Sequence, residues 1–281
     1  MASDFIPRIG PIDLNTVWGG LPLAPIDFGL PALDHYVERH DRWTEKIRIM
    51  GLDAGLYVDY RVVPGLDRLV DRVCGQSGWE RPEIYIVSDL QRRGIDGWSA
   101  VSVISDSHPV VLLGINLVET LTELELAFVL GHEVAHLLAY NGEWRNLLSM
   151  SFLIREFVEQ DKVEELNKFG SKRDWTAMYA SIMSNFRTQE VRCDRIGLLV
   201  CGDYEHAGRA LITAALRSRT IARNVDLERY LSAHLPLLEC SPQLGPFSVN
   251  AGHPFVPYRL KYLLDFVNDG SLERNLNRFA R

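Results

Sequence analysis

The sequence has few cysteines and no excess of positive charge. Its four cysteines, at positions 74, 193, 201 and 240, are widely spaced and form no C-x-x-C pair, so a dense disulfide framework is not indicated. The net charge of −7 argues against nucleic acid or an anionic membrane as the main partner. Because this cysteine usage fits a reducing compartment best, we expect a cytoplasmic protein.

The hydropathy pattern of the sequence also predicts neither a secretory signal nor a membrane-spanning segment. The start, Met1–Arg8, has no basic region followed by an apolar core. Crossing a bilayer takes ~20 apolar residues, whereas the longest candidate run, 147–154, is stopped by Arg155 and Glu156. We therefore expect no transmembrane segment and a protein that is free in solution.

The most informative segment is an apolar run, Leu124–Leu138, that contains His-Glu-x-x-His. In a helix, His132 and His136 point from one face, one turn apart, so both imidazoles can bind one Zn²⁺. Glu133 lies beside them and can take a proton from a water molecule on the metal. Polar residues inside an apolar helix are costly without partners, and a metal supplies one. The segment therefore predicts a catalytic zinc site.

A catalytic zinc site needs a third protein ligand. The compact pattern H-E-x-x-H-x-x-G-x-x-H is excluded, because the chain has Ala139 and Gly142 where it needs Gly and His. Two downstream glutamates remain, Glu156 and Glu190. We favour Glu190, because Asp194 follows one helical turn later and can orient a zinc-bound histidine. Glu156 stays an alternative ligand, although it lies in a charged run typical of a solvated helix face.

These motifs resemble the HtpX and CAAX-prenyl-protease family of gluzincin metallopeptidases, whose soluble relatives include the minigluzincins. The resemblance begins with Glu-x-x-x-Asp followed by Arg and Gly, downstream of a leucine-rich H-E-x-x-H helix. It extends to an opening helix and strand, to a strand before the zinc helix, and to a Gly-His-Pro…Arg element. These further segments are 66–75, 82–87, 109–114 and 252–260.

The resemblance implies an α+β, zincin-like fold, with a small sheet, a zinc-binding helix and a mostly helical C-terminal part. It also implies a zinc metalloendopeptidase, in which Glu133 is the general base. His253 of the His-Pro element either donates to the oxyanion or only positions the final helix. Arg259 either pairs with acidic groups near the site or lies on the surface.

Proline and glycine indicate how the chain is organised. Residues 1–31 are rich in both and predict an irregular arm, followed by one domain over 32–281. Within that domain, the patterns predict helices over 33–50 and 258–267, a hairpin from 101–104 and 110–113, and mostly helix over 121–233. The segment 235–257 is expected to be a loop.

The strand just before the zinc helix suggests how substrate is held. Pro109 cannot donate to a β-ladder, which is typical of a strand end or an edge. We therefore expect Val110, Val111 and Leu112 to form an edge strand, whose free backbone groups pair with an extended peptide or protein substrate.

Two rival functions remain open, and the oligomeric state is not indicated by the sequence. One is a catalytically weak zinc-fold protein that binds a protein partner; the presence of Glu133 argues against it. The other is a zinc hydrolase of non-peptide amides, which has less use for an edge strand.

Overall fold

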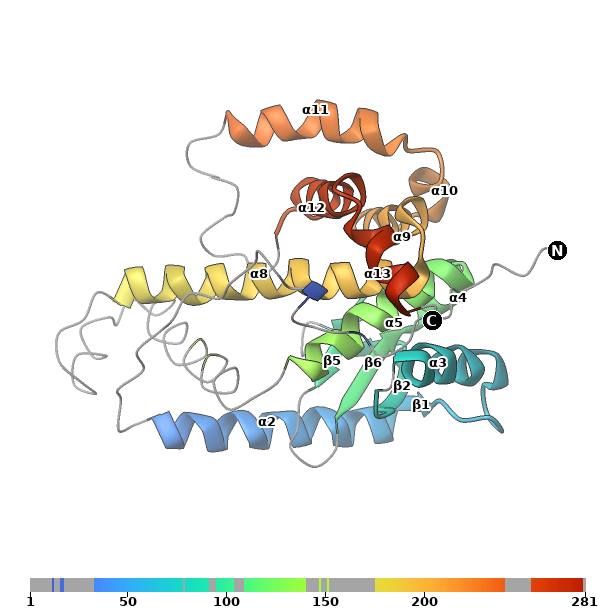
Figure 1. The fold of residues 1–281 in the computed structure, drawn as a ribbon. Helices are drawn as coiled ribbons and strands as arrows, with labels where there is room; N and C mark the ends of the chain where they lie inside the picture. The colour runs from blue at the N-terminus through green and yellow to red at the C-terminus, as the bar shows by residue number, and fades with distance from the viewer. Residues whose placement is uncertain are drawn as a thin grey trace.

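The computed structural model describes residues 12, 16–17, 33–77, 79–90, 95–103, 109–139, 147, 151, 175–240 and 254–279 (Figure 1). Over these residues the protein is mostly helical, with a small mixed sheet of four strands and a further two-stranded sheet. This confirms, in coarse form, the expected combination of a small sheet with a largely helical C-terminal part. No described helix is both long and apolar enough to cross a bilayer.

The four-stranded sheet has the order β1-β2-β6-β5. β2 and β6 are parallel, whereas β1 and β5 run antiparallel to their neighbours. The antiparallel pairing of β5 with β6 is the one expected for the predicted hairpin. The strands of this sheet are β1 (Gly55–Tyr57), β2 (Glu83–Val87), β5 (Ala100–Val103) and β6 (Val110–Gly114), and the small sheet contains β3 (Asp89–Leu90) and β4 (Ile95–Asp96).

Each face of the sheet is covered by a different apolar layer. Helix α2 (Leu33–Ala54) lies against one face, where Ile47 packs with Val110 and Leu112. The other face belongs to the main core, which includes Val111 and Leu113. Because successive side chains of a strand point to opposite faces, β6 supplies both layers. In Figure 1, α2 lies on one side of the sheet and the other helices lie mainly on the opposite side.

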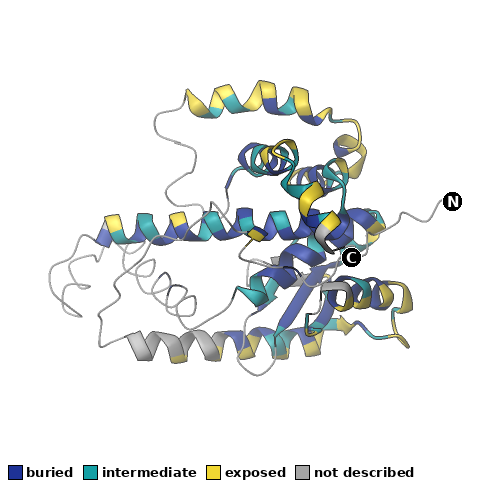
Figure 2. Cartoon of the chain, in the orientation of Figure 1, coloured by how far each residue is buried: buried dark blue, intermediate teal, exposed yellow. Residues whose placement is uncertain are grey.

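Helices on this second side form the larger part of the molecule. Helix α5 lies next to the sheet, α8 packs on α5, and α11 forms an exposed outer layer (Figure 2). The helices are α3 (Pro64–Ser77), α4 (Ile115–Thr120), α5 (Glu123–Leu138), α8 (Trp175–Cys201), α9 (Tyr204–Leu216), α10 (Arg219–Ala222), α11 (Leu227–Glu239), α12 (Val256–Asn268) and α13 (Ser271–Phe279). The predicted zinc-binding helix and the predicted closing helix correspond to α5 and α12.

The expectation that Val110, Val111 and Leu112 form an edge strand is wrong. Strand β6 lies between β2 and β5, so its backbone pairs on both sides, and all its residues are buried. Pro109 gives no edge signal, because it precedes the strand and its carbonyl accepts a hydrogen bond from the Glu83 N–H at 3.0 Å. These residues therefore have no free backbone groups for a substrate. The edge next to β6 is formed by β5.

The first residues of the loop predicted over 235–257 are helical instead. Helix α11 continues through Pro236 and ends at Glu239. A proline inside a helix leaves the carbonyl four residues earlier without its partner. Here that residue is Ser232, which is exposed, so water can donate to the carbonyl and the cost is small.

Two residues of the predicted N-terminal arm lie in the main core. Ile12 and Val17 are both buried there, and Arg195 of α8 donates to the Val17 carbonyl at 3.2 Å. At these positions the arm is packed against the domain. The rest of the arm lies almost entirely outside the described residues, so the boundary at 31–32 stays a prediction.

Candidate metal centre

Helix α5 begins with a capping box. The Thr122 hydroxyl accepts from the Glu125 N–H at 3.3 Å, and the Glu125 carboxylate accepts from the Thr122 N–H at 2.7 Å. These bonds satisfy N–H groups that a helix start leaves unpaired. The helix then runs for 16 residues, which places His132 and His136 one turn apart on the same face.

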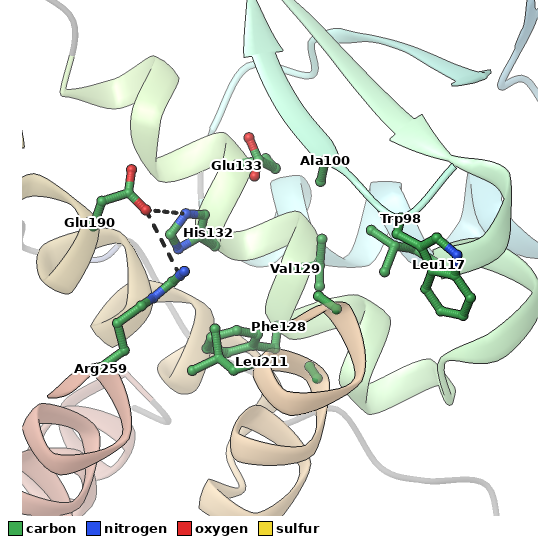
Figure 3. A pocket seen from close by; sticks show the side chains of 12 residues that line it. Trp98, Ala100, Leu117, Phe128, Val129, His132, Glu133, Glu190, Leu211 and Arg259 are labelled. Carbon is green, nitrogen blue, oxygen red and sulfur yellow. Dashed lines mark ion pairs between the residues drawn. The ribbon is translucent and has the colours of Figure 1, made fainter. Parts of the chain in front are cut away.

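Helix α8 brings a carboxylate to the two histidines. Glu190 Oε2 lies 3.4 Å from Nε2 of His132, and its Oε1 lies 3.2 Å from Nε2 of His136. The two Nε2 atoms are 3.0 Å apart. Figure 3 shows the carboxylate of Glu190 turned toward His132. Three groups from two helices thus converge on one point.

The spacing of these atoms fits a zinc ion. Zn²⁺ bonds to nitrogen and oxygen are about 2.0–2.1 Å long, so the ligand atoms of a tetrahedral site lie about 3.3 Å apart. The three separations of 3.0, 3.2 and 3.4 Å lie close to that value. Two imidazoles and one carboxylate are also a donor set of catalytic zinc sites, which keep a fourth position open. His132, His136 and Glu190 could therefore hold the ion.

One further carboxylate lies on the other side of His132. Asp194 is fully buried, and its Oδ1 lies 2.9 Å from Nδ1 of His132. Arg259 of α12 donates to both oxygens of Asp194, at 2.7 and 2.5 Å. This paired contact fixes the plane of the carboxylate, which in turn orients the imidazole.

These contacts shift the pKa values of the buried groups. Burial alone would lower the pKa of His132, but the hydrogen bonds and charges of Asp194 and Glu190 raise it to about 10. Burial would raise the pKa of Asp194, but Arg259 and His132 hold it below its usual value. The pKa of Arg259 is raised by Asp194 despite its own burial. The metal-free site therefore holds a buried, charged network.

Two glycines allow α5 and α8 to come close together. A Cβ atom on Gly197 would lie 2.6 Å from the Phe128 carbonyl oxygen, and one on Gly131 would lie 3.0 Å from the Val200 side chain. The first distance is shorter than real Cβ contacts, and the second is tighter than most of them. The hydrogens of these glycines thus set the distance between the helix of the histidines and the helix of Glu190.

A pocket with a volume of about 130 Å³ opens beside the cluster (Figure 3). One end is polar and contains His132, Glu133, Glu190 and Arg259. The rest of the wall is apolar and is formed by Trp98, Ala100, Leu117, Phe128, Val129, Ala210, Leu211 and Ala214. An apolar side chain of a bound molecule could thus lie next to the candidate ligands His132 and Glu190.

Glu133 has a partner that the motifs do not indicate. Its carboxylate Oε2 lies 2.6 Å from the hydroxyl of Ser102 in β5. Ser102 belongs to no motif, and the only signal in the sequence is its position in a short strand near the zinc helix. Sequence alone does not show which strand residues face that helix.

The comparison with known families decides where the chain belongs. Residues 105–267, more than half of the chain, match Peptidase family M48. The chain belongs to peptidase family M48. This confirms the HtpX-like resemblance inferred from the motifs.

Two curated proteins, one named as a metallopeptidase and one as a protease, are similar to this chain. Plastoglobule-localized metallopeptidase 48, chloroplastic, of Arabidopsis thaliana is 28% identical over 189 residues, which are 67% of this chain and 51% of the relative. The chain therefore spans about half the length of that relative. A protease HtpX homolog of Moorella thermoacetica is 24% identical over 226 residues, 73% of each chain. No solved structure matches the chain.

In this M48 protein, the structure brings six of the predicted site residues to one place. They are His132, Glu133, His136, Glu190, Asp194 and Arg259. Val110, Val111 and Leu112 belong to the centre of the sheet instead. His253 and Glu156 lie outside the described residues, so the oxyanion role of the first and the ligand role of the second stay predictions.

Proposed function

We propose that this M48 protein is a zinc-dependent endopeptidase of zincin-like fold. The observation that carries the proposal is the convergence of His132, His136 and Glu190 on one point, with Glu133 on the same helix. Family membership supports metallopeptidase activity in general, and both relatives are named as a protease or metallopeptidase. A chain that only bound a partner would have no need of a carboxylate at position 133.

The chemistry follows from the donor set and the neighbouring base. When bound, zinc supplies a Lewis acid that lowers the pKa of a water molecule at its fourth position. Glu133 takes a proton from that water with a carboxylate oxygen. It then passes the proton to the amide nitrogen of the departing peptide segment. The carboxylate of Asp194, held by Arg259, lies 2.9 Å from Nδ1 of His132 and would orient this imidazole, so that Nε2 would be the atom that binds zinc.

The structure also supports a view of how the peptide is held. β5 has β6 as its single partner among the described strands, and it runs past Glu133. An extended peptide could pair with the open side of β5, and this edge replaces the one expected at β6. One side chain of that peptide would then enter the pocket lined by Phe128, Val129 and Leu211. We expect an apolar residue there.

The experiment combines metal content with peptide cleavage. Zinc is measured by elemental analysis in the wild type, Glu190→Ala and Glu133→Gln, and cleavage is measured on a library of extended peptides. We expect one zinc per chain in the wild type and in Glu133→Gln, and loss of zinc in Glu190→Ala. Glu133→Gln should lose at least about a hundredfold in kcat, because its amide cannot take the proton.

The same data distinguish the endopeptidase from the rival functions. A wild type that holds zinc and cleaves no peptide contradicts the endopeptidase proposal and leaves a protein-binding module. Cleavage of small amides without cleavage of peptides indicates the amide hydrolase. Full zinc content in Glu190→Ala would show that another residue, such as Glu156, is the third ligand. The cytoplasmic location stays a prediction.

A further inference from the structure

The hydroxyl of Ser102 lies within hydrogen-bond distance of two oxygens of Glu133. Ser102 Oγ is 2.6 Å from Oε2 of the carboxylate and 2.7 Å from the backbone carbonyl oxygen of the same residue. The two residues are 31 positions apart, one in strand β5 and one in helix α5. The hydroxyl therefore touches both the proposed general base and the backbone of the helix that carries it.

The alternation of β5 explains why this side chain faces α5. Val103 is buried in the layer beneath α2, and Val101 packs against the same layer. Residues on either side of them must point the other way. Accordingly, Ala100 lines the pocket beside the metal ligands and Ser102 contacts Glu133. A register shift of one residue would replace the hydroxyl with a valine side chain.

A hydroxyl suits this place because it can donate and accept. Ser102 has one hydrogen, so it cannot donate to both Glu133 oxygens at once. When the carboxylate is ionised, the hydroxyl can donate to Oε2. When the carboxyl is protonated, its O–H can donate to Oγ, and the serine can donate to the backbone carbonyl. The contact thus remains satisfied before and after the base takes its proton.

We propose that Ser102 is a positioning residue that holds the Glu133 carboxylate in place while Glu133 accepts and returns a proton. The inference rests on the proposed peptidase function. A fixed carboxylate is already oriented toward the reacting water, so less ordering is left for the transition state. If Ser102 only packed β5 against α5, a side chain of similar size without a hydroxyl would give the same activity.

A pair of variants of similar shape separates these two roles. Ser102→Thr keeps the hydroxyl, whereas Ser102→Val replaces it with a methyl group. We expect Ser102→Val and Ser102→Ala to lower kcat by about ten- to a hundredfold, the value of a hydrogen bond to a charged group. KM should change by less than about twofold, because substrate binding is retained. Ser102→Thr should keep kcat within about threefold, and all variants should keep one zinc.

Crystal structures of the Ser102→Thr and Ser102→Val variants give a readout that does not depend on turnover. We expect the Glu133 carboxylate to contact the hydroxyl of the introduced threonine, and to leave this position in the valine variant. Equal kcat for the two variants, or an unmoved carboxylate in the valine structure, would overturn the inference. A wild type that cleaves no peptide contradicts the proposed function instead, and the two structures still decide whether Ser102 positions Glu133.

Discussion

Two carboxylates one turn apart on α8 have different surroundings. Glu190 faces both histidines, whereas Asp194 is enclosed by His132 and Arg259. A buried carboxylate is costly unless opposite charges and hydrogen bonds offset its lost hydration. Arg259 supplies both, through two N–H groups that match the two oxygens of Asp194. Arg259 of α12 therefore stabilises the buried carboxylate of Asp194 in α8.

Replacing Arg259 should therefore destabilise the protein. Arg259→Ala leaves Asp194 buried without its main partner, and we expect a loss of about 3–5 kcal/mol in the free energy of unfolding. Arg259→Lys should lose less, because it keeps the charge but not the two parallel hydrogen bonds. Urea unfolding of the metal-free proteins at pH 7 measures both.

A surface arginine provides the control. Arg229 pairs with Asp226 at 3.5 Å, and its side chain is 89% exposed. Its replacement by alanine should change the free energy of unfolding by less than about 1 kcal/mol. Equal effects of Arg259→Ala and Arg229→Ala would show that the buried pair contributes no more than an exposed one.

At this scale, the sequence was informative wherever a contact is local. His132 and His136 are one helical turn apart, and so are Glu190 and Asp194, so helical periodicity alone places each pair on one face. The contact of Ser102 with Glu133 could not be predicted in this way, because it depends on how β5 lies against α5. Contacts between residues of two different elements can be identified only when the relative positions of the elements are known.

At the scale of elements, the packing of α5 on α8 controls the site. Gly197 contacts the Phe128 carbonyl without room for a Cβ atom. Any side chain there must push the helices apart or bend them, which typically costs about 1–3 kcal/mol. The same movement would withdraw Glu190 from His132 and His136.

Gly197→Ala should therefore weaken zinc binding, although Gly197 has no side chain that could touch the metal. We expect at least a roughly tenfold rise in the zinc dissociation constant, equivalent to about 1.4 kcal/mol. Competition with a zinc chelator measures it. The matched control is Gly75→Ala in α3, where a Cβ atom would meet nothing within 4 Å. That variant should keep zinc affinity, and an equal loss in both variants would contradict the packing argument.

Strand β5 offers a test of substrate pairing. The Gly114 N–H donates to the Ser99 carbonyl at 2.7 Å. In an antiparallel pair such bonds alternate, so the backbone groups of Ala100 and Ser102 are expected to point away from β6. Ala100→Pro should remove one outward donor and lower kcat/KM by about tenfold, or about 1.4 kcal/mol of transition-state binding.

The neighbouring residue of β5, Val101, should respond differently to the same substitution. Val101→Pro would remove a donor directed at β6, so we expect loss of stability in thermal unfolding rather than a selective loss of activity. Folded Ala100→Pro protein with normal cleavage of an extended peptide would show that substrate does not pair with β5.

The sequence predicted which elements exist better than how they neighbour one another. Apolar periodicity indicated α5, α12 and the β5–β6 pair. It could not show that β6 is central, because its parallel partner β2 lies 27 positions earlier, as in the pair of Glu83 with Val110, and parallel pairing leaves no local turn signal. The three residues of β1 were too few to form a pattern, and α13 was not predicted.

At the scale of the whole molecule, the site joins α5 and α8 to β5 and α12. Zinc that binds this folded arrangement must stabilise it against unfolding. The gain is about 4 kcal/mol when free zinc exceeds its dissociation constant by about 1,000-fold. Motifs could predict the candidate ligands, but the assembly of the site required the fold.

Zinc binding should release a proton at neutral pH. The pKa of His132 in the metal-free protein is raised to about 10, so its imidazole is charged at pH 7, whereas zinc needs it neutral. Apparent zinc affinity should therefore increase as the pH rises from 7 toward 10. Calorimetric titrations at pH 7 in buffers with different ionisation enthalpies count the released protons. Zinc binding without proton release would contradict the raised pKa.

The metal-free fold should show the opposite pH dependence. A raised pKa in the folded state stabilises the protein fully below the unfolded value, about 6.5 for histidine, and this stabilisation is lost as pH rises toward 10. Chelator-treated protein should thus unfold at lower urea concentration at pH 9 than at pH 6.5. Asp194→Asn, which lacks the charge next to His132, should show a smaller change.

The Asp194–Arg259 pair also has a consequence for synthesis on the ribosome. The two residues are 65 positions apart, and translation adds about 5–20 residues per second. For roughly 3–13 seconds, a growing chain has therefore made His132, His136 and Glu190 but not the arginine that neutralises their buried neighbour. A nascent chain thus carries all three proposed metal ligands before the residue that completes their surroundings has been synthesised.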